Sequence, residues 1–210
     1  MFPKEYEEAF NLVKKYCKSP SHDVWHAFRV FNLAMRIQEK EGGNKTIISY
    51  ASILHDIADR KVLGEQGLKI IQEFLKEKIS DKEKEEVLRI IKSMGFKGAL
   101  EKETFKTIEE AIVKDADKLD AIGAIGIARA FAYGGENKRF IFDPNEKVKL
   151  HKNRKEYLTS STSTINHFYE KLIHLKDKLF TKTAKNIASK RHAFLILFLE
   201  EFFNEWWNND

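Results

Sequence analysis

The chain has one cysteine, three prolines and ten glycines among its 210 residues. The single cysteine, Cys17, excludes a disulfide framework within the chain and favours a reducing compartment. Because residues that end helices are scarce and alternating β-branched runs are few, the sequence predicts an all-α protein. The sequence also lacks P-loop, G-x-G-x-x-G, C-x-x-C and nucleophile-elbow motifs, so none of the functions tied to those motifs is indicated.

Long hydrophobic runs are missing as well. The longest late apolar run, Ala193 to Leu199, is far shorter than the roughly 20 residues that span a bilayer. The first five residues, Met1 to Glu5, become charged at once and lack the pattern of a signal peptide. We therefore expect a cytoplasmic protein that has no membrane partner.

Charge of one sign is not concentrated in any segment. The 37 Lys and Arg against 32 Asp and Glu leave a net charge of +5, but opposite charges alternate, as in Glu83 to Glu86. Such alternation is typical of solvated helix faces and argues against nucleic acid as a partner. The modest basic excess is compatible with a phosphorylated small molecule.

A hydrophobic content of 42% over 210 residues suits one domain with one core. We predict a single domain over 1–210, in which 134–164 form a loop or lid and 165–210 form C-terminal helices packed on the core. Ser21 is predicted to cap the second helix. Apolar periodicity and breaker positions predict helices over 3–17, 22–41, 64–78, 81–94, 107–133 and 181–207.

A histidine and an aspartate, His55 and Asp56, stand side by side near the end of an apolar segment that starts at Ile47. Another histidine, His26, falls in a helix that is apolar on nearly all sides and is therefore predicted to be buried. Two interpretations are open: hydrogen-bonded core side chains, or ligands of a metal. Imidazole and carboxylate are mixed ligands that first-row divalent metals accept.

Three aspartates in 107–133 are candidates for a further ligand: Asp115, Asp117 and Asp120. Helical periodicity places Asp117 and Asp120 on one face and turns Asp115 about 160° from Asp117. Periodicity thus narrows the choice of a metal ligand among the three aspartates but does not select one. For each of them the alternative role is an ion pair with a neighbouring Lys or Arg. Two histidines and two aspartates leave room on a six-coordinate metal for water and substrate oxygens.

Other polar residues occur near these candidates in the sequence. Arg29 lies one turn after His26 on nearly the same face, and a buried guanidinium needs an anion such as a carboxylate or a phosphate. Asp59 lies one turn beyond Asp56 and is placed to face the same cavity.

The C-terminal part of the chain carries two features with open interpretations. His167 shares a helical face with Lys171 and with His174, and either a substrate site or solvated surface explains this spacing. The final helix ends in aromatic residues, from Phe202 to Trp207, which either cover the core or form the contact of a homodimer.

These motifs resemble the HD superfamily of metal-dependent phosphohydrolases, whose pattern is H…HD…D. The resemblance covers most of the chain and is closest to small stand-alone bacterial and archaeal HD proteins of a nucleotide pyrophosphohydrolase-like branch. It implies an all-α HD-domain helical bundle with the metal site at the centre of the core helices. The motifs that carry it are Ser21–Val30 (SHDVWHAFRV), Leu54–Asp59 (LHDIAD), Asp115–Ala124 (DADKLDAIGA) and Asn166–Leu172 (NHFYEKL).

Carried over residue by residue, the resemblance implies one divalent transition metal, which is Mn, Fe, Ni, Co or Zn, with manganese preferred by some members. Its implied ligands are His26, His55, Asp56 and Asp117. Lys118 matches a position that contacts phosphate in some nucleotide-cleaving relatives. Asp59-Arg60 stands where the guanosine-tetraphosphate hydrolases of the superfamily carry a Glu-Asp pair.

The expected activity is cleavage of a nucleoside triphosphate phosphoanhydride by metal-activated water. Asp56 or Asp59 is expected to accept the proton. The residues expected to contact the substrate are Arg29, Lys118, His167 and Lys171, and the charge of the transition state is assigned to the cations among them. Two alternatives stay open: a nucleoside monophosphate phosphomonoesterase, and a metal-containing nucleotide-binding sensor with little turnover.

Overall fold

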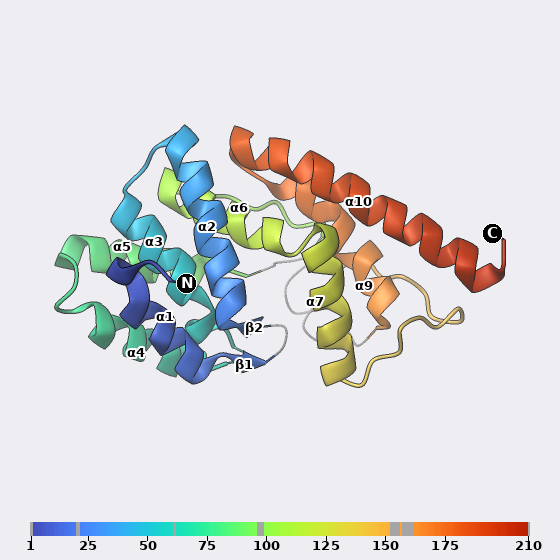
Figure 1. Ribbon diagram of the computed structural model, residues 1–210, viewed down its shortest axis with the longest axis horizontal. Helices are drawn as coiled ribbons and strands as arrows, with labels where there is room; N and C mark the ends of the chain where they lie inside the picture. Colours follow the sequence, from blue (N-terminus) through green and yellow to red (C-terminus); the bar gives the residue numbers. More distant parts are fainter. Residues whose placement is uncertain are drawn as a thin grey trace. The chain divides into compact units, whose positions relative to one another are not determined.

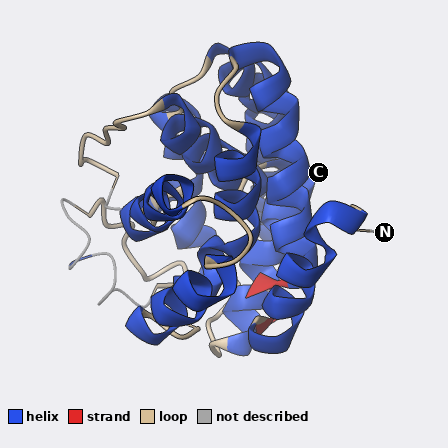
Figure 2. Ribbon diagram, turned by 90° about the vertical axis from the view of Figure 1, so that its left-hand side faces the viewer, coloured by secondary structure: helices blue, strands red, loops and turns tan. Residues whose placement is uncertain are grey.

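A computed structural model of the protein describes residues 2–19, 22–60, 62–95, 99–151, 156 and 162–209. Almost all of the regular structure in this part of the chain is helical (Figures 1 and 2), which confirms the all-α prediction. The exception is a pair of antiparallel two-residue strands, β1 (Lys18–Ser19) and β2 (His22–Asp23). Within these described residues, no helix is long and apolar enough to cross a membrane.

Contacts along the chain divide it into two compact units. Unit 1 comprises residues 1–96 and 104–117, and unit 2 comprises residues 97–103 and 118–210. The boundary falls inside helix α6 (Ile108–Asp120), between Asp117 and Lys118. Each unit has its own buried apolar side chains, such as Leu54 in unit 1 and Phe168 in unit 2. The single domain over 1–210 stays a prediction.

Helix α3 (Lys45–Leu54) is the centre of unit 1. Every residue from Ile47 to Leu54 is buried, as expected for a helix that carries apolar side chains on all sides. Asn44 caps this helix, because its side chain accepts a hydrogen bond from the Ile47 amide at 3.2 Å. The elements packed around α3 are α1 (Glu7–Tyr16), α2 (Val24–Glu41), α5 (Asp81–Ser93) and the 3-10 helix η2 (His55–Ala58).

Unit 1 also contains the 3-10 helix η1 (Lys4–Tyr6) and α4 (Glu65–Leu75). Helix α4 packs against η2 and α5. Gly67 permits this close packing, since a Cβ atom at that position would overlap the carbonyl group of Ile57. The turn that carries His55 and Asp56 is therefore held on one side by α4.

The start of α2 differs from the prediction. The helix begins at Val24 and is capped by Asp23, whose Oδ1 accepts a hydrogen bond from the His26 amide at 2.8 Å. The predicted cap, Ser21, lies outside the described residues. The helix is also less buried than predicted on one side, since Trp25 is 54% exposed.

A buried ion-pair network joins α5 to α6 in unit 1. The Glu110 carboxylate accepts hydrogen bonds from Arg89 at 2.5 Å and from Lys114 at 2.6 Å. Burial alone would raise the pKa of Glu110, but the hydrogen bonds from Lys114 and Arg89 outweigh it and lower the pKa to about 2. Glu110 therefore stays ionised at neutral pH although its side chain is buried.

Unit 2 contains α7 (Gly123–Glu136), α9 (Thr164–Glu170), the 3-10 helix η3 (Leu172–Lys178) and α10 (Lys182–Trp207). Residues 107–133, predicted as one helix, are divided because α6 ends at Asp120 and α7 begins at Gly123. Gly123 adopts a φ of 78°, which favours glycine. Arg191 on α10 donates to the Leu119 carbonyl at 2.5 Å and so satisfies a carbonyl at the end of α6.

Small residues of α7 allow close packing. A Cβ atom at Gly126 would overlap the backbone of Ala121, and one at Gly134 would overlap the hydroxyl oxygen of Thr164 on α9. Helix α7 also packs against α10.

The predicted loop or lid over 134–164 is shorter at its start, because α7 continues to Glu136. Its described part, 137–151, is hydrogen-bonded to the start of α9. The carbonyls of Phe140 and Ile141 accept hydrogen bonds from the amides of residues 164 and 165 at 2.9 Å each, and the Glu146 carboxylate accepts one from the Ser163 amide at 2.7 Å. Residues 152–155 and 157–161 lie outside the described residues, and the role of a lid stays a prediction.

The aromatic end of α10 packs partly on this segment. The ring of Phe142 meets Phe202, Phe203 and Trp206 edge-on, at centroid distances of 5.2 to 6.2 Å. Trp207 remains 55% exposed. Three of the aromatic residues thus cover apolar surface of unit 2, and the homodimer contact stays a prediction.

Replacing Glu110 by Gln should lower the free energy of unfolding by about 3 kcal/mol at pH 7, because two cations lose a buried carboxylate. Glu110 ionises more readily in the folded chain, so this contribution is complete above the unfolded pKa of 4.5. It should shrink as the pH falls toward about 2, the folded value. Urea unfolding of wild type and E110Q at pH 7 and pH 3 measures the difference, with the exposed Glu85→Gln as control. An equal difference at both pH values would contradict the assignment.

Candidate metal centre

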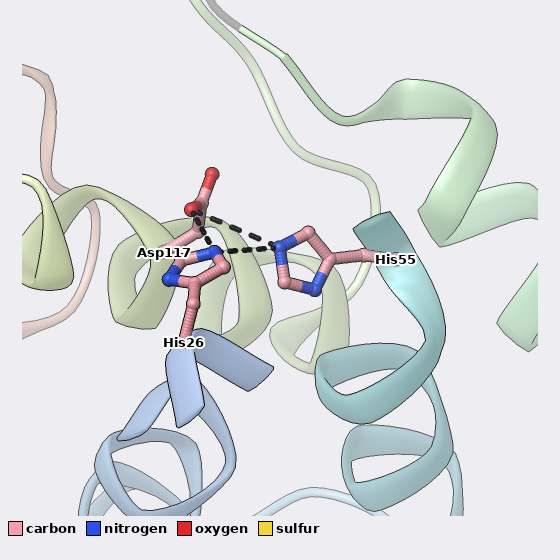
Figure 3. Close-up of side chains that lie close together, drawn as sticks. All are labelled: His26, His55 and Asp117. Atoms are coloured by element: carbon pink, nitrogen blue, oxygen red, sulfur yellow. Dashed lines mark hydrogen bonds and ion pairs between the residues drawn. The ribbon is translucent and has the colours of Figure 1, made fainter. Parts of the chain in front are cut away.

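Three elements of unit 1 bring two imidazole rings and a carboxylate to one point (Figure 3). His26 lies in the first turn of α2, His55 begins η2 directly after α3, and Asp117 lies on α6. The Nε2 atoms of the two histidines are 3.3 Å apart. Asp117 Oδ1 lies 3.5 Å from His26 Nε2 and 3.8 Å from His55 Nε2.

Asp56 completes this cluster. Its Oδ2 lies 3.5 Å from His26 Nε2, and its Oδ1 lies 3.3 Å from His55 Nε2. The neighbours His55 and Asp56 reach the same point because the cluster lies in the seam between α2, η2 and α6. The structure therefore brings together the four residues that the family resemblance implies as ligands.

The cluster is buried except at one residue. The side chains of His26, His55 and Asp56 are 1%, 5% and 6% exposed, whereas that of Asp117 is 33% exposed. Charged and polar groups buried to this degree need strong partners.

A backbone contact fixes the hydrogen position on His55. Its Nδ1 lies 2.9 Å from the Ser52 carbonyl oxygen, which can only accept, so Nδ1 carries the proton. In the neutral ring Nε2 then presents a lone pair to the cluster, as in histidines that bind metals. Burial alone would lower the pKa of His55, but the carboxylates of Asp56 and Asp117 outweigh it and raise the pKa. The same carboxylates favour any cation at this point.

The distances fit a shared cation better than direct hydrogen bonds. Charge-assisted hydrogen bonds between nitrogen and carboxylate oxygen span about 2.7–2.9 Å, whereas the four nitrogen–oxygen distances here are 3.3 to 3.8 Å. Ligand atoms about 2.1 Å from a metal lie about 3.0 Å apart in an octahedron and about 3.4 Å apart in a tetrahedron. The donor set therefore fits a divalent metal in both spacing and chemistry.

Arg29 lies on the same helix as His26, and Asp59 directly follows the 3-10 helix that carries His55 and Asp56. Asp59 follows η2 and is half-buried, and its carbonyl accepts hydrogen bonds from the amides of Val62, Leu63 and Gly64. Arg29 is half-buried on α2, one turn beyond His26. Their catalytic roles stay predictions.

The other two aspartates of α6 have different surroundings. Asp120 pairs with Arg129 at 3.0 Å, so the ion-pair alternative is correct for this residue. Asp115 is fully buried and is not among the three residues, His26, His55 and Asp117, whose ligand atoms converge.

The remaining predicted contacts belong to unit 2. Lys118 Nζ lies 2.7 Å from the Glu103 carboxylate, donates to the Lys178 carbonyl at 3.0 Å and sits over the ring of Phe180. Glu103 comes from a segment without regular structure, so periodicity gives no signal for this pair.

The predicted continuous helix through His174 is wrong. Helix α9 carries His167 and ends at Glu170, while Lys171 follows as its cap residue with a φ of −139°. His174 lies in η3, where its Nε2 is bonded to the Tyr169 carbonyl at 2.9 Å. The roles predicted for His167 and Lys171 in substrate binding stay predictions.

The sequence of this chain matches the family model "HD domain" over residues 24–122, which include all four cluster residues. A curated relative, the uncharacterized protein YpgQ of Bacillus subtilis (strain 168), is 33% identical over 189 residues. This match covers 88% of this chain and 84% of YpgQ.

Two solved structures are similar over almost their whole length. An HD-superfamily hydrolase from Bacillus thuringiensis is 38% identical, with a TM-score of 0.73 and coverage of 97% of each chain. The crystal structure of Bacillus subtilis YpgQ in complex with ADP is 29% identical, with a TM-score of 0.75 and coverage of 95% of this chain and 96% of that chain.

Replacing Asp117 by Asn should reduce the metal content of the purified protein from about one ion per chain to a small fraction, since a charged ligand is lost. Asp115→Asn is the matched control, two residues away on the same helix, and should keep its metal. Elemental analysis of both variants, with folding checked by circular dichroism, measures the difference. Equal metal content in the two variants would exclude Asp117 as a ligand.

Removing the metal should destabilise unit 1, because an ion that binds only the folded state stabilises it by mass action. At a free metal concentration 100 times the Kd, this effect is about 2.7 kcal/mol, or about 5–10 °C in Tm for a chain of this size. Calorimetry before and after chelation, with metal loss confirmed, tests the effect. An unchanged Tm would mean that the ion binds outside the buried cluster.

Proposed function

Because the chain belongs to the HD-domain superfamily and is a metal-dependent phosphohydrolase, we propose that it cleaves a phosphoanhydride bond of a nucleoside triphosphate. The observation that carries this proposal is the cluster of His26, His55, Asp56 and Asp117, which is buried except at Asp117. On a six-coordinate ion these four ligands leave positions for water and a phosphoryl oxygen. When bound, a divalent metal would supply Lewis acidity that activates water and neutralises phosphoryl charge.

The nucleotide is inferred from a relative. YpgQ, which is similar over most of both chains, has been crystallised in complex with ADP. ADP contains the base, sugar and anhydride-linked phosphates that a nucleoside triphosphate also contains. The similarity between the two chains supports a nucleotide as the class of ligand for this protein.

The two neighbouring carboxylates have separate roles in this proposal. The two oxygens of Asp56 lie 3.5 and 3.3 Å from histidine nitrogens, so we assign this carboxylate first to holding the metal. Asp59 follows the same turn, is half-buried and is held by the three amides that bind its carbonyl. We assign Asp59 as the acceptor of the proton from the attacking water, with Asp56 as the second candidate.

Cations of the chain would balance the remaining phosphate charge. Arg29 is the first of these, because it lies one helical turn from His26 on α2, and a guanidinium group can bind two phosphate oxygens at once. Lys118 must exchange the Glu103 carboxylate for a phosphate oxygen before it can contribute. His167 and Lys171 are assigned to the same substrate, and the expected products are a nucleoside monophosphate and pyrophosphate.

With Mn²⁺ and a panel of nucleoside triphosphates, the purified protein should release pyrophosphate together with the monophosphate. Separate assays for pyrophosphate and orthophosphate identify the bond that is cleaved. Orthophosphate released only from monophosphates would replace this proposal by a phosphomonoesterase. Saturable binding without turnover, with the metal present, would replace it by a nucleotide sensor.

Substitution of Arg29 by Ala should lower kcat/KM by about 10²–10³-fold while the metal content stays intact, the scale of losing one charge-stabilising donor. Lys118→Ala should have an effect of the same direction. Arg36→Ala is the matched control, since Arg36 is an exposed arginine on the same helix. If Arg29→Ala and Arg36→Ala behave alike, Arg29 has no part in binding the transition state.

A further inference from the structure

The strand pair of unit 1 ends directly at the helix that carries His26. Strands β1 and β2 pair in antiparallel register, with Lys18 opposite Asp23 and Ser19 opposite His22. Helix α2 begins at the next residue, Val24. The backbone of Asp23 is therefore held by strand pairing at the point where the helix starts.

The side chain of Asp23 acts on the other side of this junction. Its Oδ1 accepts a hydrogen bond from the backbone amide of His26 at 2.8 Å. Amides in the first turn of a helix have no carbonyl partner within the helix, so a capping side chain supplies their partner. Here the capped amide belongs to the residue whose ring enters the metal cluster.

We propose that Asp23 is a positioning residue for metal binding, which fixes the first turn of α2 and thereby the direction of the His26 ring. The ring is almost fully buried, and its Nε2 must lie within a few tenths of an ångström of its place to act as a ligand. Without the cap the first turn of α2 frays, and His26 is in that turn. The strand pair and the Asp23 cap thus link the segment that follows α1 to His26.

This inference depends on His26 as a ligand and not on the identity of the substrate. Helix α3 offers a comparison within the same unit, because Asn44 caps it by accepting from the Ile47 amide at 3.2 Å. Ile47 is an apolar residue, and His55 comes eight residues later. Both caps stabilise the start of a helix, but only the amide capped by Asp23 belongs to an inferred metal ligand.

The test compares five proteins: wild type, Asp23→Ala, Asp23→Asn, Asn44→Ala and His26→Ala. Zn²⁺ affinity is measured by competition with a chelating dye, and Tm is measured on the metal-free proteins. Asp23→Ala should bind Zn²⁺ about 10–100-fold more weakly, the usual effect of losing a group that orients a ligand. Asp23→Asn should restore affinity because Asn caps as well as Asp. Asn44→Ala should keep wild-type affinity. Both Asn44→Ala and Asp23→Ala should lower the Tm by about 2–4 °C, because each removes a helix cap.

Four results would overturn the inference, each in a different way. Equal loss of affinity in Asp23→Asn and Asp23→Ala would mean that the charge of Asp23 matters and its hydrogen bond does not. Equal loss in Asn44→Ala and Asp23→Ala would mean that affinity follows general stability. Unchanged affinity in His26→Ala would refute the metal centre itself, whereas loss in His26→Ala with none in Asp23→Ala would refute only the role of Asp23.

Discussion

The main physical constraint on unit 1 is its buried cluster of imidazole nitrogens and carboxylate oxygens, whose lone pairs lie close together. The lone pair of His55 Nε2, with its proton fixed on the opposite nitrogen by Ser52, faces carboxylate oxygens at 3.3 and 3.8 Å. Taking one partner away from a buried charged pair costs about 3–5 kcal/mol, so a cation shared by these groups would stabilise them. The apolar burial of α3 holds the turn that presents His55 and Asp56 and offsets part of this cost.

Unit 1 contains a second buried carboxylate, that of Glu110, which is stabilised differently. There the cations are Arg89 and Lys114, which belong to the chain and approach to 2.5 and 2.6 Å. Those distances are hydrogen bonds, whereas the spacing in the histidine cluster is that of ligands around an ion. Glu110 therefore links α5 to α6, while the histidine cluster has the donor set of a candidate metal site.

The sequence indicates most of what depends on near neighbours. The apolar run of α3, its cap at Asn44 and the positions of both histidines follow from composition and spacing. The choice of Asp117 needs the family resemblance, because periodicity leaves Asp120 on the same face, and only the structure places Arg129 beside Asp120. The break after α6 comes before Gly123 with its φ of 78°, and the Leu119 carbonyl there is satisfied by Arg191, which lies 72 residues further along the chain and cannot be found from local sequence. The start of α2 is ambiguous because Ser and Asp are equally good caps.

The turn between His55 and α4 restricts how this protein can change in length. The Asp59 carbonyl collects three successive amides, and Gly67 brings α4 against the carbonyl of Ile57. An added or deleted residue in this stretch would shift the amides out of reach and move a side chain into the contact. The contacts at Asp59 and Gly67 therefore restrict the length of the chain between them, because a change in length there would disturb the turn that carries His55 and Asp56.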